Sequence, residues 1–192
     1  MRDKVKDILL ENIRVKEEML RTAISQIMEI ANLISECLKK EGKVILFGNG
    51  GSAGDSQHIA AELVGRFKKE RAGLAAIALT TNTSILTALA NDYGYEAVFS
   101  RQIEALGKKN DVAVGISTSG KARNVAAAIK QAAKMGLKTV VLTGANGTEL
   151  AKLANFSVVV PSISTPRIQE AHITIGHIIC EIVEDTIFQG QK

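Results

Sequence analysis

Short runs of apolar residues alternate along the chain with longer segments whose apolar positions recur at helical spacing. Continuous apolar runs are typical of parallel strands that are buried on both faces. Such strands are expected at 44–47, 75–79, 112–116, 139–142 and 157–160. Helices are expected at 54–67, 84–90, 95–106, 122–135, 148–154 and 166–188. Because strands that alternate with helices form right-handed crossovers, the pattern predicts an α/β fold, a three-layer sandwich around a five-stranded parallel sheet.

The segment 1–41 differs from the rest because it contains neither glycine nor proline. Its apolar residues follow the helical period, which predicts one long helix or two consecutive helices that end near Gly42. A helix of this length exceeds what a small domain can cover, so we expect it to pack against another subunit. The chain is therefore divided into an N-terminal helical segment, 1–41, and a domain at 42–192.

Composition narrows the functional classes. At 192 residues and 46% apolar residues, the chain can form one domain with a full core. It has no apolar run of about 18 residues and a charged N-terminus, so we expect no membrane span, no signal peptide and a cytoplasmic location. A net charge of only +4 and 4% aromatic residues give little support for a nucleic-acid partner. Cys37 and Cys180 lack C-x-x-C spacing and are expected to be buried thiols.

A glycine-rich loop follows the first predicted strand. Gly48, Gly50 and Gly51 allow a tight turn, and Ser52 can cap the next helix and donate its hydroxyl group. The unpaired N–H groups of that helix N-terminus favour an anion such as a phosphate. Further along the same helix, His58 and Glu62 are four residues apart and therefore lie on one face.

Several interpretations of this loop are open. It is not a Walker loop, because no Gly-Lys-Ser/Thr follows the glycines. It matches the loose dinucleotide pattern G-x-G-x-x-A, but the acidic residue expected about 20 positions later is missing. A plain tight turn is a further possibility. The imidazole and carboxylate behind the loop favour a site for a phosphorylated sugar.

A second polar loop, Ser117-Thr118-Ser119-Gly120, follows the predicted strand 112–116. By itself it could be an ordinary turn. In a parallel sheet, however, ligands bind beyond the carboxyl ends of the strands, and both loops are predicted at that edge. Together they offer the N–H groups and hydroxyls that a sugar phosphate requires.

Four segments carry a resemblance to a known family: FGNGGSAGDSQHIAAEL, GISTSGKARNV, ALANDYG and RIQEAHITIGH. Nearly the whole chain is similar to the sugar isomerase (SIS) domain family, and within it to enzymes that isomerise a seven-carbon sugar phosphate. The resemblance implies a flavodoxin-like fold and a zinc-dependent homotetramer with active sites between subunits. It also implies an aldose–ketose isomerase that converts sedoheptulose 7-phosphate to D-glycero-D-manno-heptose 7-phosphate through an enediol. This reaction begins the synthesis of nucleotide-activated heptose for bacterial surface polysaccharide such as lipopolysaccharide.

The resemblance also implies roles for individual residues. Glu62 would be the base and His177 the acid, although the residues alone favour a core or interface histidine at position 177. The implied zinc ligands are His58, Glu62, Gln169 and His177. The implied substrate contacts are Asn49, Gly50, Gly51, Ser52, Glu62, Asn91, Asp92, Ser117, Thr118, Ser119 and Gln169. Gln169 and His177 are about 12 Å apart along one helix, so both reach one metal only if their side chains converge or neighbouring subunits contribute.

Two further points concern this resemblance. Where many relatives have a serine in the second loop, this chain has Ala122, which removes one possible phosphate hydroxyl. The main alternative function is that of a non-catalytic SIS protein that binds the bacterial replication initiator. Those relatives lack the His/Glu/Gln/His set that this chain retains, so the sequence favours an enzyme.

Overall fold

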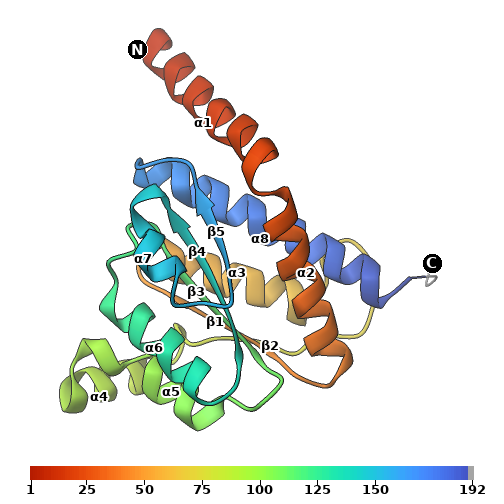
Figure 1. Ribbon diagram of the computed structural model, residues 1–192, viewed down its shortest axis with the longest axis vertical. Helices are drawn as coiled ribbons and strands as arrows, with labels where there is room; N and C mark the ends of the chain where they lie inside the picture. The colour runs from red at the N-terminus through yellow and green to blue at the C-terminus, as the bar shows by residue number, and fades with distance from the viewer. Residues whose placement is uncertain (190–192) are drawn as a thin grey trace.

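The computed structural model describes residues 1–189 and has three layers, with helices on both faces of a parallel sheet (Figure 1). The strands are β1 (Val44–Gly48), β2 (Ala76–Ala78), β3 (Val112–Ser117), β4 (Lys138–Gly144) and β5 (Phe156–Val160). They form one five-stranded sheet in the order β2-β1-β3-β4-β5, and every neighbouring pair is parallel. The predicted α/β fold is confirmed.

The helices lie close to their predicted positions. They are α1 (Arg2–Thr22), α2 (Ile24–Lys39), α3 (Gly51–Val64), α4 (Thr83–Tyr93), α5 (Ser100–Leu106), α6 (Arg123–Lys134), α7 (Thr148–Ala151) and α8 (Thr165–Ile187), with 3₁₀ turns η1 (Tyr95–Ala97) and η2 (Ala145–Gly147). The helix expected at 95–106 is divided into η1 and α5. The helix expected at 54–67 begins earlier, at Gly51, and ends at Val64.

The sheet separates two apolar cores, and β1 contributes alternate residues to each. Val44 and Leu46 face the core that includes residues of α2, α3 and α8, whereas Ile45 and Phe47 face the core beneath α5 and α6. None of the four side chains is more than 1% exposed. Burial on both faces explains why this strand is apolar without interruption.

The N-terminal segment consists of two helices with different surroundings. In α2, Ile27, Ile30 and Ile34 are buried in the core between the sheet and α8. By contrast, α1 projects away from the body of the chain, and only Val15 and Met19 among its residues are buried (Figure 1). Within residues 1–189, no helix combines the length and apolar character needed to cross a membrane.

Close packing of α3 against α8 positions the candidate site. Gly51, at the start of α3, contacts Gln169 near the start of α8. Further along both helices, Ile59 of α3 contacts Gly176 of α8, so the two helices run parallel. A Cβ atom at Gly176 would lie 2.6 Å from Cδ1 of Ile59, so the absence of a side chain lets the helices approach. Residues far apart along the chain thereby meet beside this contact.

Candidate functional site

The loop between β1 and α3 has the features of an anion site. Gly50 has a positive φ of 56°, a conformation that glycine adopts without strain. Gly51 lies beneath the side chain of Gln169, because a Cβ atom there would be 2.2 Å from its Nε2 atom. Ser52 is 3% exposed and lies in the first turn of α3. The N–H groups of Ser52 and Ala53 donate to the carbonyls of Asn49 and Gly50 at 3.0 Å each. Those of Gly50 and Gly51 make no hydrogen bond within residues 1–189 and are available to an anion at the sheet edge.

The two polar loops line one hollow of about 280 Å³. Its lining residues are Asn49, Ser52, Ile116, Ser117, Thr118, Ser119, Lys121 and Ala122. The second loop is fixed by β4, since Thr143 Oγ1 donates to the carbonyl of Ser117 at 2.7 Å and Gly144 N donates to that of Thr118 at 3.2 Å. The hollow offers hydroxyls and one lysine, a combination suited to a phosphate group.

Asn49 is held in place by residues that the sequence interpretation missed. Its side-chain amide exchanges two hydrogen bonds of 2.9 Å with that of Asn124. The hydroxyl of Tyr95 donates to Asn49 Oδ1 at 3.0 Å. Lys121 was missed as well, although its place directly after Gly120 was a usable signal. The contacts of Tyr95 and Asn124 with Asn49 could not be predicted from the local sequence pattern, because they join segments that are distant along the chain.

Three predicted metal ligands converge where α3 packs against α8. His58 Nε2 lies 3.0 Å from Glu62 Oε1 and 3.2 Å from His177 Nε2. One ligand atom from each residue lies within 4.8 Å of the others. Imidazole nitrogen and carboxylate oxygen are common zinc donors, so this donor set fits a zinc ion.

The fourth predicted ligand, Gln169, contacts the start of α3. Its amide covers Gly51, about seven residues before His58 on α3, which corresponds to about 10 Å of helix rise. The amide of Gln169 therefore lies at the start of α3, before the turns that carry His58 and Glu62.

Asn91 and Asp92 lie in the last turn of α4 and are exposed. Asn91 Nδ2 donates to Asp92 Oδ1 at 2.8 Å, and neither residue lines the hollow. No residue of α4, which is described in full, is buried, and the polar last turn of this helix faces outward.

Asp55, one helical turn before His58, is a further acidic group of this region. Burial raises the pKa of its carboxyl to about 6, and the nearby His58 opposes the shift. Within residues 1–189, Asp55 Oδ2 is buried without a hydrogen-bond partner.

Comparison with known proteins identifies the family. The SIS domain family matches residues 10–144. Phosphoheptose isomerase of Aquifex aeolicus is 54% identical over 187 residues, which cover 97% of this chain and 98% of that protein. The structure of phosphoheptose isomerase GmhA from Neisseria gonorrhoeae is 42% identical, with a TM-score of 0.90 and 96% of this chain and 98% of that chain covered. The structure of a phosphoheptose isomerase from Francisella tularensis is 34% identical, with a TM-score of 0.92 and 95% and 97% covered. The chain belongs to the phosphoheptose isomerase family of SIS-domain proteins.

Proposed function

We propose that the protein is the isomerase that converts the ketose sedoheptulose 7-phosphate to the aldose D-glycero-D-manno-heptose 7-phosphate. The observation that carries this proposal is the convergence of His177 on α8 with His58 and Glu62 on α3, the helix whose N-terminus lines the hydroxyl-rich hollow. A phosphosugar isomerase requires both an anion site and a positioned acid and base, and this arrangement supplies both.

The substrate phosphate would occupy the hollow. The hollow is lined by Ser52, by the hydroxyls of the Ser117–Ser119 loop and by Lys121, which would contact the phosphate. The N–H groups of Gly50 and Gly51, directly before Ser52, would donate to it as well. Asn49 keeps one amide hydrogen that could be donated to a sugar hydroxyl, because its Oδ1 atom already accepts from Asn124 and Tyr95. The amide of Gln169, above Gly51, could donate to or accept from another sugar hydroxyl. Binding by the phosphate would leave the carbonyl end of the sugar for chemistry.

In net terms, the reaction moves one hydrogen from C1 to C2 and one from the C1 hydroxyl to the C2 oxygen. The Glu62 carboxylate takes the proton from C1 of the ketose, the C–H electron pair forms the C1=C2 double bond, and the C2 carbonyl oxygen gains a proton. His177 then delivers a proton to C2, while the C1 hydroxyl loses its proton and becomes the aldehyde carbonyl. Donor groups near the C2 oxygen stabilise the negative charge that develops there.

Zinc is the metal that we propose for this site. His58, Glu62 and His177 would bind it, and Gln169 is the further ligand that the family resemblance implies; in this chain Gln169 would reach it through a movement or from a neighbouring subunit. A zinc ion held there would supply a Lewis acid for the oxygen atoms of the substrate.

The remaining parts of the proposal concern assembly and pathway. Asn91 and Asp92 do not line the hollow of their own chain. In a homotetramer, these residues of one subunit would contact the site of another. The protein would act in the cytoplasm at the first step of heptose synthesis for lipopolysaccharide. Binding of the replication initiator is disfavoured, because that role needs no converging imidazole and carboxylate groups.

The function is tested with the Glu62→Gln variant. The amide keeps the size of the side chain but cannot accept the proton from C1, so kcat on sedoheptulose 7-phosphate should fall at least about a hundredfold. The measurement is a coupled isomerase assay with added zinc. Removal of the metal with a chelator should lower the wild-type rate, and zinc should restore it.

The matched control is Glu36→Gln, an exposed glutamate of α2 whose ion pairs lie at the surface. It should retain the wild-type kcat. Near-normal turnover by Glu62→Gln would show that another residue is the base. A wild-type protein without isomerase activity in this assay would refute the function itself.

A further inference from the structure

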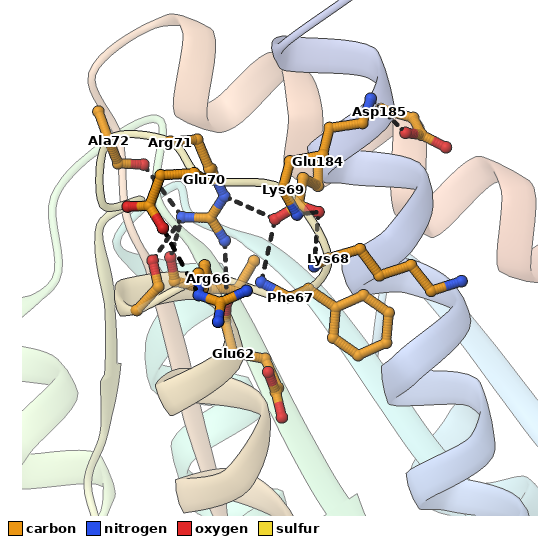
Figure 2. Close-up of polar contacts among 12 residues, drawn as sticks. Glu62, Arg66, Phe67, Lys68, Lys69, Glu70, Arg71, Ala72, Glu184 and Asp185 are labelled. Atoms are coloured by element: carbon orange, nitrogen blue, oxygen red, sulfur yellow. Dashed lines mark hydrogen bonds and ion pairs between the residues drawn. The ribbon is translucent and has the colours of Figure 1, made fainter. Parts of the chain in front are cut away.

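A buried ion pair lies at the carboxyl end of α3, next to the candidate metal ligands. It joins Arg71, in the segment that follows α3, to Glu184 near the end of α8 (Figure 2). Arg71 Nε lies 2.8 Å from Glu184 Oε2, and the two side chains are 1% and 2% exposed. Isolated charges at this depth are unfavourable, so each group depends on the other and on its hydrogen bonds.

Glu184 organises the backbone of the segment after α3. Its carboxylate accepts hydrogen bonds from the N–H groups of Phe67, Lys68 and Lys69 at 3.0, 2.8 and 2.8 Å (Figure 2). Burial alone would raise the pKa of this carboxyl, but these three bonds and the Arg71 guanidinium outweigh it and lower the pKa to about 2. Glu184 is therefore ionised at neutral pH.

Arg71 binds the carboxyl end of α3. Its Nη2 atom donates to the carbonyl of Glu62 at 2.8 Å, and its Nη1 atom donates to the carbonyls of Leu63 at 2.9 Å and Gly65 at 3.0 Å. Carbonyls at the end of a helix have no partner within the helix, so the guanidinium replaces the missing donors. The backbone of Glu62, whose side chain is the proposed base, is one of the groups fixed in this way.

The same segment also contacts the proposed acid. Phe67, whose N–H group binds Glu184, has its ring centroid 5.6 Å from that of His177. One buried pair thus contacts the backbone of Glu62 on α3 and, through Phe67, the ring of His177 on α8.

We infer that Arg71 and Glu184 are positioning residues of the isomerase, which fix Glu62 relative to His177. This inference rests on the proposed function. The two residues touch no substrate, and they act through the backbone of Glu62 and the ring of Phe67. The hollow for the phosphate lies at the opposite end of α3, so the pair should influence proton transfer and metal binding more than substrate affinity.

Three variants test this inference. Arg71→Lys keeps the charge but loses the planar fork that reaches several carbonyls, and Glu184→Gln keeps the size but loses the charge. The control is Lys69→Gln, because the Lys69–Asp185 pair also joins this segment to α8 at 2.6 Å but is 36% and 59% exposed. The measurements are kcat and KM, zinc affinity by competition with a chelator, and the histidine ring signals of metal-free protein. The chain has three histidines, so the signals can be assigned by substitution.

In Arg71→Lys and Glu184→Gln, we expect kcat to fall about tenfold or more and zinc affinity to weaken by about tenfold, as is common when groups that orient metal ligands are removed. KM should change less than about threefold, and the His177 ring signal should move as Phe67 moves. Lys69→Gln should match the wild type in every measurement.

Folded Arg71→Lys and Glu184→Gln proteins with wild-type kcat, zinc affinity and His177 signal would overturn the inference. Loss of fold in both variants would also overturn it, because the pair would then be required for the fold in general. If the wild type shows no isomerase activity, the proposed function fails, while zinc affinity and the His177 signal still decide whether the pair positions the ligands.

Discussion

Two histidines on α8 show how position determines the chemistry of a residue. His177 meets His58 and Glu62 at the surface of the helix pair. His172 is 0% exposed, and within residues 1–189 neither of its ring nitrogens has a hydrogen-bond partner. Burial lowers the pKa of His172 to about 4. His172 is thus a neutral core residue at physiological pH.

This burial predicts a dependence of stability on pH. The unfolded chain binds a proton at His172 near pH 6.5, whereas the folded chain does so only near pH 4. The stabilising contribution of the neutral ring is therefore present above pH 6.5 and is lost as the pH falls toward 4. Between pH 7 and pH 5 the loss should be about 2 kcal/mol.

The measurement compares denaturant unfolding of the wild type and His172→Leu at both pH values. The variant lacks the titrating ring, so its free energy of unfolding should decrease by about 2 kcal/mol less than that of the wild type over this range. All other titrating groups are common to both proteins. Equal pH dependence of the two proteins would mean that folding does not change the pKa of His172.

At the scale of elements, α6 begins without a side-chain cap. Its N-cap residue is Ala122, which also lines the hollow. Serine at this position should accept a hydrogen bond from the first turn and raise the free energy of unfolding by about 1 kcal/mol. A hydroxyl facing the hollow should also lower KM for the sugar phosphate.

Thermal unfolding and steady-state kinetics of Ala122→Ser test both effects. The control is Ala126→Ser, in the interior of the same helix, which should be slightly destabilised because serine has a lower helix propensity than alanine. An unchanged KM in a stabilised Ala122→Ser protein would place the phosphate away from this end of α6.

The elements were predictable because their signals are local. Apolar runs identified the strands, and glycine positions such as Gly136 marked the ends of helices. The start of α3 was missed, because Gly51 belongs to the first turn although glycine usually interrupts helices. The division between η1 and α5 was also missed, because Val98 and Phe99 are buried apolar residues that continue a helical pattern.

The candidate site was predictable only in part for the same reason. The spacing of His58 and Glu62 on one helix follows from the helical period. The meeting of His177 with them depends on the parallel packing of α3 and α8, which no local pattern contains. The contacts of Arg71 with Glu184 likewise join segments that are 113 residues apart. Packing of distant segments therefore had to be seen in the structure.

At the scale of the whole molecule, α1 presents apolar side chains that its own chain leaves uncovered. Ile8, Leu9, Ile13 and Leu20 are 42%, 59%, 49% and 67% exposed. A groove of about 420 Å³ between α1, α2 and α8 is lined mainly by apolar residues, including Ile13, Leu20 and Ile178. Exposed apolar surface of this extent is typical of subunit interfaces.

If α1 is buried in the proposed homotetramer, light scattering of the wild type should give the mass of four chains. The double variant Ile13→Asp/Leu20→Asp should dissociate, because burying two carboxylates in an apolar interface is unfavourable. Its isomerase activity should fall as well if neighbouring subunits complete the site. Lys134→Asp, at the end of α6 on the other side of the sheet, should remain tetrameric. A fully active monomer would contradict both expectations.

The projection of α1 has a consequence for how the protein reaches its active form. An isolated helix with two buried residues contributes little to the folding of its own chain. If other subunits cover α1, its ordering becomes part of a bimolecular encounter that follows the folding of the α/β body. Activity would then recover faster after dilution from denaturant when the chain concentration is higher. During synthesis, α1 is made before the rest of the chain, so its apolar face would stay exposed to solvent until the subunits assemble.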